Sequence, residues 1–152
     1  MKLFREIYKE QIKTIKSSLK FKYMVMDELY TFIGKKTKRY YVWTSMAFTS
    51  TGKKFYFYHL SKNKDAGALF NFNQDLPIIN KVYTDGCFSY DKIYGSKATL
   101  EKSKMTNIIE NLNSQLRDKI SYLVRRTKAH AKSFHWLDNR LALFFSHKNL
   151  NL

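Results

Sequence analysis

Cysteine, proline and glycine are scarce in this chain, which has one, one and five of them in 152 residues. The single cysteine, Cys87, excludes a disulfide framework and a cysteine-ligated zinc finger. The low proline and glycine content, together with 44% hydrophobic residues, excludes a collagen-like or low-complexity disordered chain. No apolar run approaches the roughly 20 residues that cross a bilayer, and the charged first residues lack the apolar core of a signal peptide. We therefore expect a cytoplasmic globular protein.

Acidic residues are also few, because 12 Asp and Glu stand against 28 Lys and Arg, for a formal net charge of +16. Solubility alone needs a net charge of only about 2–8 in a small domain. A polyanionic partner explains the excess, since each phosphate neutralised by a cation releases counterions and adds affinity. Nucleic acid is the partner that we expect, rather than a membrane. An anionic membrane surface and a solvated basic face without a specific partner are the alternatives.

The first 20 residues have the pattern of a basic amphipathic helix. Apolar residues recur on one face from Leu3 to Leu19, and lysines and Arg5 fill much of the opposite face. Such a helix can pack on a protein core, lie on DNA or lie on a membrane, and packing is the interpretation that we favour. We therefore divide the chain into a helix over residues 1–21 and a domain over residues 22–152.

Three segments rich in aromatic and β-branched residues follow and predict an antiparallel meander of strands. They span residues 22–34, 39–49 and 54–60. Gly34 and the lysine-rich residues 35–38 form the first predicted turn. A short helix over about 61–76 comes next, with Asp65 as its N-cap. A fourth strand over 79–84 follows Pro77, which ends this helix.

The second half of the sequence is mainly helical. Residues 87–104 show no clear period and are expected to form a loop with a turn at Gly95. A long helix over about 106–126 follows, and a last helix covers about 134–146. The order of three strands, a helix, a strand and two helices indicates a mixed α/β arrangement.

Three of the few acids occupy informative places. Asp27 interrupts an apolar strand; it is either a structural acid paired with a lysine or a metal ligand, since a buried carboxylate must be paired, protonated or metal-bound. Asp85 follows the fourth strand in an Asp-Gly pair, which is ordinary turn chemistry but also lies where strand ends expose ligands. Glu110 stands in the first turns of the long helix, where the helix dipole alone favours an acid.

These three acids predict a metal site if they converge, because their charges repel one another without a divalent cation. Mg²⁺ suits this pattern, since it binds through one or two carboxylates plus substrate phosphates. Two such ions about 3.5–4 Å apart can clamp the attacking and leaving oxygens of an in-line phosphoryl displacement. The expected cofactor is therefore a pair of Mg²⁺ ions, with Mn²⁺ as the substitute.

The same acids stand in motifs that resemble those of insertion-sequence-one (InsB-like) transposases. The motifs are MDELYTFIGKK at 26–36, RYYVW at 39–43, YTDG at 83–86, IENLN at 109–113, Leu116-Arg117, RRT at 125–127 and Lys132-Ser133. The resemblance extends over about residues 22–146, and the ordered set of motifs is more specific than any one of them.

This resemblance implies a DDE-class enzyme with a ribonuclease-H-like fold: an α/β structure whose mixed sheet has an antiparallel three-stranded meander plus a further strand, flanked by helices. It implies that Asp27, Asp85 and Glu110 are the catalytic, metal-binding triad, and that Arg117 is the basic residue seven positions after the Glu. The implied reaction is metal-dependent cleavage at transposon ends, followed by strand transfer into target DNA.

The resemblance also implies partners. These are double-stranded DNA at both steps, association with the nucleoid, further copies of the chain in the active complex, and an upstream-encoded DNA-binding subunit or fusion that recognises the element ends. Two other interpretations stay open. One is a catalytically silent basic DNA-binding or regulatory fragment of a transposase, and the other is a membrane-surface protein bound through the first 20 residues.

Basic residues near the predicted site are expected to contact DNA phosphates, which position a duplex without reading its sequence. They are Lys35, Lys36, Arg39, Arg117, Lys119, Arg125, Arg126, Lys128 and Lys132. Surface solvation is the alternative for several of them.

Overall fold

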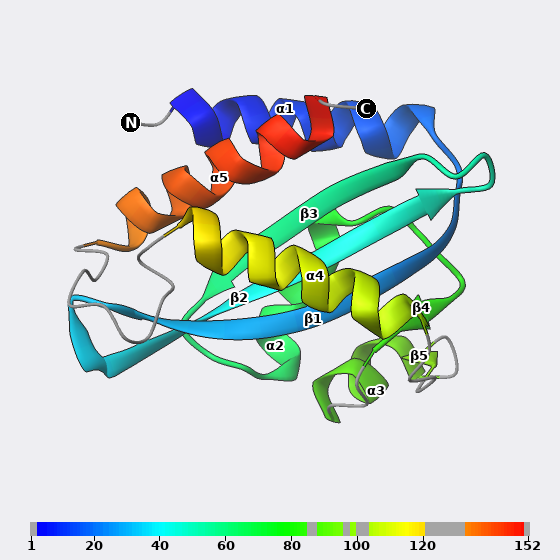
Figure 1. Cartoon of the computed structure of the whole chain (residues 1–152). Helices are drawn as coiled ribbons and strands as arrows, with labels where there is room; N and C mark the ends of the chain where they lie inside the picture. Colours follow the sequence, from blue (N-terminus) through cyan, green and yellow to red (C-terminus); the bar gives the residue numbers. More distant parts are fainter. Residues whose placement is uncertain (1–2, 85–87, 96–97, 100–103, 121–132, 151–152) are drawn as a thin grey trace.

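Five strands form one mixed sheet in the order β3-β2-β1-β4-β5 (Figure 1). They span Phe21–Ile33 (β1), Lys35–Thr49 (β2), Lys54–Ser61 (β3), Val82–Tyr83 (β4) and Ala98–Thr99 (β5). β2 pairs antiparallel with both β1 and β3, and β4 pairs parallel with both β1 and β5. The computed structural model describes residues 3–84, 88–95, 98–99, 104–120 and 133–150. Within them, the predicted α/β class and the meander are confirmed, and the topology is consistent with a ribonuclease-H-like fold.

Gly34 makes the first turn of the meander almost alone. Its φ of +76° is a conformation that glycine adopts without steric cost, and Ile33 pairs across it with Lys35. Gly34 lies in the turn as predicted, but residues 35–38 do not, because they already belong to β2. The result is a long two-stranded ribbon that carries its basic residues to one end of the sheet (Figure 1).

Helices cover both faces of the sheet (Figure 1). In the described part of the chain they span Leu3–Ser18 (α1), Ala66–Asp75 (α2), Phe88–Tyr94 (α3), Lys104–Lys119 (α4) and Phe134–Leu150 (α5). α1, α4 and α5 lie on one face, and α2 and α3 lie on the other. None of the helices described here is long and apolar enough to cross a membrane.

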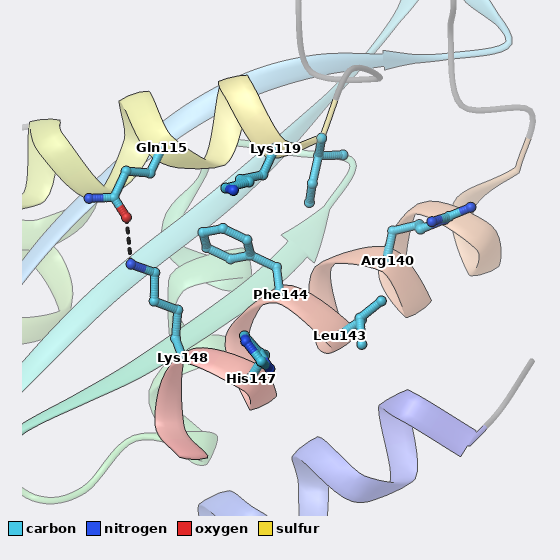
Figure 2. A pocket seen from close by; sticks show the side chains of 8 residues that line it. Gln115, Lys119, Arg140, Leu143, Phe144, His147 and Lys148 are labelled. Carbon is cyan, nitrogen blue, oxygen red and sulfur yellow. Dashed lines mark hydrogen bonds between the residues drawn. The ribbon is translucent and has the colours of Figure 1, made fainter. Parts of the chain in front are cut away.

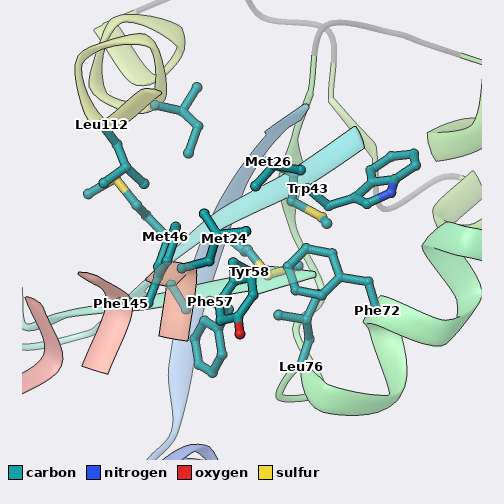
Figure 3. Close-up of a cluster of buried hydrophobic side chains, with 14 of the residues drawn as sticks. Met24, Met26, Trp43, Met46, Phe57, Tyr58, Phe72, Leu76, Leu112 and Phe145 are labelled. Carbon is teal, nitrogen blue, oxygen red and sulfur yellow. The ribbon is translucent and has the colours of Figure 1, made fainter. Parts of the chain in front are cut away.

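The alternation of side chains along the central strands supplies a core on each face. Met46 of β2 lies with Leu112 of α4 on one side of the sheet, whereas Trp43 lies with Phe72 of α2 on the other (Figure 3). Trp43 and Phe72 are completely buried. Because both faces are covered, the central parts of β1 and β2 are largely apolar, and the polar residues within them stand out as exceptions.

The structure differs from the sequence prediction in several elements after the meander. The loop predicted over 87–104 is wrong in part, because it contains α3 and β5, and Tyr90 of α3 is fully buried with its ring edge against Trp43. Asp65 is the N-cap as predicted and accepts a hydrogen bond from Ala68 N over 2.9 Å, so α2 starts only after it. Of the long helix predicted over 106–126, α4 ends at Lys119 and positions 121–126 lie outside the described residues.

The N-terminal helix packs on the protein core. Tyr8 of α1 is completely buried and accepts a hydrogen bond from the Tyr58 backbone in β3 over 2.9 Å. Arg5 forms a 3.3 Å ion pair with Asp138 of α5 and donates to the Tyr58 hydroxyl, which in turn donates to Asp138. At the other end of α5, Asn149 donates to and accepts from the Tyr56 backbone, which extends this helix beyond its predicted end.

Candidate active site

Asp27 lies in the middle of β1 on the face covered by α4, in a chain of hydrogen bonds. Asn113 of α4 donates from Nδ2 to Asp27 Oδ2 over 2.9 Å, and its Oδ1 accepts from the Thr44 hydroxyl over 2.9 Å. Asn113 is only 3% exposed and Thr44 is completely buried. Since buried amides and hydroxyls must keep their hydrogen bonds, this arrangement fixes the orientation of the Asp27 carboxylate.

A cavity of about 120 Å³ joins Asp27 to Glu110. Asp27 lines it from β1 and Glu110 lines it from α4, with Val25, Met26 and Ile109 supplying apolar wall. The buried stripe of α4 explains the position of Glu110, because Ile109 and Leu112 face the sheet and leave Glu110 at the exposed edge. The structure thus brings together two acids that are 83 positions apart in the sequence.

The end of β4 reaches the same cavity. Val82 and Tyr83 pair with Met24 and Val25 of β1, which places the carboxyl end of β4 beside Asp27. Tyr83 and Thr84 both line the cavity. Asp85 is the next residue and lies outside the described residues, so its predicted place in the triad stays a prediction.

The donor set at this cavity fits a hard divalent cation. Carboxylate oxygens are the protein ligands that Mg²⁺ takes, and two carboxylates at one small cavity concentrate negative charge that a cation relieves. Among the described residues no group of three or more His, Cys, Asp and Glu side chains could hold a metal ion. With Asp85 outside the described part, the structure shows two of the three predicted ligands at one place.

Glu28, the neighbour of Asp27, lies on the opposite face of the sheet. Its side chain is 4% exposed, forms a 2.6 Å ion pair with Lys64 and accepts a hydrogen bond from the Tyr90 hydroxyl. A structural acid paired with a lysine was one interpretation of Asp27, and Glu28 is an acid of that kind. Strand alternation is the reason, since consecutive residues face opposite layers.

The predicted DNA-contacting residues fall into three groups. Arg39 is exposed, stands 4.5 Å from the Tyr30 ring centre, and lines a 640 Å³ cavity with Lys38 and Lys62. Arg117 and Lys119 are exposed on α4, and Arg117 follows Glu110 by two helical turns on the same side. The others have no described side chain: they are Lys35, Lys36, Arg125, Arg126, Lys128 and Lys132.

Sequence reasoning missed the residues that hold Asp27 in place. Asn113 appears in the sequence prediction only as the last residue of the IENLN motif, whereas the structure shows it buried against Asp27 and Thr44. A signal was present, because Asn113 stands four residues after Ile109, within the apolar stripe of α4. A polar residue at such a position predicts a buried hydrogen-bond partner, although it does not tell which one.

Comparison with known protein families places the residues of this cavity within one family match. A family model described as IS1 transposase matches residues 23–151, which include every described residue that lines the cavity. A search of curated proteins finds no match. The matched region covers most of the chain and extends from β1 to α5. The chain therefore belongs to the IS1 transposase family, whose members process and bind DNA.

Proposed function

We propose that this chain is a DDE-type transposase that cleaves DNA at transposon ends and transfers the freed ends into target DNA. The shared cavity is the observation that supports it. Asp27 and Glu110 line this cavity, and Thr84 brings the chain to it one residue before Asp85. These are the three acids that the resemblance assigns as the triad.

Both chemical steps are in-line displacements at phosphorus. In the first, a water oxygen forms a bond to phosphorus while the P–O3′ bond breaks, and the 3′-oxygen leaves with a proton. In the second, that 3′-hydroxyl attacks a phosphodiester of the target, whose own 3′-oxygen leaves. The second step exchanges one phosphodiester bond for another, so it needs no nucleotide cofactor.

The residues of this chain contribute position and charge. Asp27, Asp85 and Glu110 would hold two Mg²⁺ ions, or Mn²⁺ in their place, through their carboxylate oxygens. When bound, the ions would lower the pKa of the attacking water and neutralise charge that develops on the phosphate. Asn113 keeps the Asp27 carboxylate aimed, because it donates to one of its two oxygens.

Metal binding can be tested without knowing the DNA sequence of the element ends. Mn²⁺ should raise the thermal unfolding midpoint of the full chain, since a ligand that binds only the folded state stabilises it. Asp27→Asn, Asp85→Asn and Glu110→Gln should each remove most of that rise. Asp118→Asn is the matched control, because Asp118 is an exposed acid on the same helix.

Activity is the second readout of the same variants. We expect Mg²⁺-dependent joining of a pre-cleaved duplex end to plasmid DNA by the native chain, and loss of joining with intact DNA binding in each triad variant. DNA binding by the native chain without metal-dependent stabilisation or joining would instead favour the catalytically silent fragment. Full activity in any single variant would remove that residue from the triad.

A further inference from the structure

A second cavity, of about 540 Å³, lies between α4 and α5 and shares no residue with the one at Asp27 (Figure 2). Four basic side chains line it, namely Lys119 from α4 and Arg140, His147 and Lys148 from α5. Leu143 and Phe144 lie between them, as Figure 2 shows, and supply an apolar floor. We call this feature the α4–α5 groove.

The groove is positive, because Lys119, Arg140 and Lys148 line it and no acidic residue does so among the residues that the structure describes. Helix dipoles explain a cation at the end of α4 and another at the end of α5, where Lys119 and Lys148 stand. They do not explain Arg140, which stands in the first half of α5, or the absence of acids from the lining. The sequence prediction had included Lys119 alone among these residues.

Part of the groove is preorganised. The Lys148 ammonium donates to Gln115 Oε1 across the groove (Figure 2) and lies 5.6 Å from the Tyr56 ring centre and 5.9 Å from that of Phe144. The Arg140 guanidinium lies 5.5 Å from the ring centre of Trp136. Contacts of this kind hold a cation in one place, which reduces the entropy lost when it meets a ligand.

We propose that the α4–α5 groove holds the phosphate backbone of duplex DNA. Charge complementarity selects this occupant, since phosphates match the basic lining and sugar rings match the apolar floor. A second copy of the chain fits poorly, because a two-fold contact would place the same basic residues against each other. DNA is also the partner that membership in a transposase family supplies.

The distance between the groove and the candidate active site is set by α4. The inference drawn from this distance rests on the proposed function. Lys119 follows Glu110 by nine residues of one helix, which is about 13 Å at 1.5 Å per residue. Since one strand of B-DNA rises about 3.4 Å per nucleotide, that span is about four nucleotides. The groove would thus hold DNA a few base pairs away from the phosphate that reacts.

The experiment measures DNA affinity as a function of salt, so that it does not depend on catalysis. The full chain carries Asp27→Asn to prevent cleavage, and fluorescence anisotropy follows its binding to a labelled duplex of arbitrary sequence. The groove variant combines Lys119→Gln, Arg140→Gln and Lys148→Gln. The charge-matched control combines Lys13→Gln, Lys20→Gln and Lys53→Gln, three exposed lysines outside the groove.

We expect the groove variant to reduce the slope of log affinity against log salt by up to about 2.7, since each lost phosphate contact removes about 0.9. The control should leave that slope unchanged. The proposal would be overturned if the groove variant kept the native slope or if the two triple variants had equal slopes. It would also be overturned if the groove bound an acidic protein but not DNA. The result stands whether or not the triad proves catalytic, because only binding is measured.

The proposal can still be tested if the groove variant does not fold. Both triple variants are first compared with the native chain by thermal unfolding. If the groove variant is unfolded, Lys119→Gln alone replaces it, because this side chain is exposed at the end of α4. The single change should lower the slope by about 0.9, and an unchanged slope would contradict the proposal.

Discussion

Asp27 and Glu28 are neighbours in β1, yet the sheet places them in different surroundings. Asp27 lies under α4, accepts a hydrogen bond from Asn113 and lines a cavity with Glu110. Glu28 faces the opposite layer, where its buried carboxylate binds Lys64 and the Tyr90 hydroxyl. Asp27 thus shares a cavity with a second acid, and Glu28 forms an ion pair with a lysine on the opposite layer.

This difference shows what separates a candidate ligand from a structural acid. A buried ion pair repays part of its desolvation cost only while both partners remain, so Glu28 contributes to folding through Lys64. Two carboxylates at one cavity raise the energy of the empty site and gain from a divalent cation. Two acidic side chains at adjacent positions would therefore have opposite thermodynamic roles if Asp27 binds metal as proposed.

Replacing each acid with the corresponding amide should separate the role in activity from the role in stability most clearly. Asp27→Asn should reduce metal-dependent activity by about a thousand-fold or more, because a lost ligand removes several kcal/mol of transition-state stabilisation. Glu28→Gln should instead lower the free energy of unfolding by about 2–3 kcal/mol, somewhat less than is usual for a broken buried ion pair because Lys64 is partly exposed. Strand-transfer assays and urea unfolding measure the two effects.

The stability of Asp27→Asn and the activity of Glu28→Gln serve as controls for these two substitutions. Asp27→Asn should unfold at about the same urea concentration as the native chain, since the amide has the shape of the carboxylate and its oxygen can still accept the hydrogen bond from Asn113. Glu28→Gln should keep its activity per folded molecule. A large loss of stability in Asp27→Asn, or a large loss of activity in folded Glu28→Gln, would contradict the assignment of Asp27 to activity and of Glu28 to stability.

Asn113 tests whether orientation of Asp27 matters to the metal. Asn113→Ala should raise the Mn²⁺ concentration for half-maximal thermal stabilisation by about 10–100-fold, as loss of an outer-shell partner does in metal sites. Thr44→Val should cause a smaller increase, because the Thr44 hydroxyl is linked to the Asp27 carboxylate through Asn113. Ser114→Ala is the matched control on the exposed side of α4. If Asn113→Ala lowers stability but leaves the Mn²⁺ dependence unchanged, Asn113 is a packing residue only.

The smallest effect concerns His59 on the face that carries Glu28. His59 pairs with Trp43 across β2 and β3 and stacks on Phe72 at 5.9 Å between ring centres. Burial lowers its pKa, so the unfolded chain takes up a proton near pH 6.5 while the folded chain does not yet do so. Stability should therefore fall as the pH drops from about 7.5 through 6.5 toward the lowered pKa of the folded state.

His59→Gln should reduce this pH dependence. Urea unfolding at a series of pH values measures it, and His135→Gln is the control because His135 is exposed. The activity of folded His59→Gln at neutral pH should equal that of the native chain, since His59 lies on the layer opposite the candidate site. An unchanged pH dependence of stability in His59→Gln would assign it to other groups.

Much of the fold was predictable because its signals are local. The meander follows from β-branched and aromatic runs, and α2 follows from Asp65 as its cap. α3 was not predictable in this way, since Tyr90 is placed by contacts with Trp43 and Glu28 that are distant in sequence. At the site, the scarcity and placement of acids made Asp27 and Glu110 candidate metal ligands, although each also had an ordinary structural explanation. Their assignment to a catalytic triad came from a resemblance.

The sequence by itself determined the excess of positive charge, the order of the meander strands and of helices α1, α2, α4 and α5, and the motifs of a transposase, because each is a property of composition or of neighbouring residues. Only the tertiary structure decided that Asp27 rather than Glu28 shares a cavity with Glu110, that Asn113 aims Asp27, and that Lys119, Arg140 and Lys148 line one groove. Strand pairing and helix packing bring such residues together across dozens of positions, and neither leaves a local mark in the sequence.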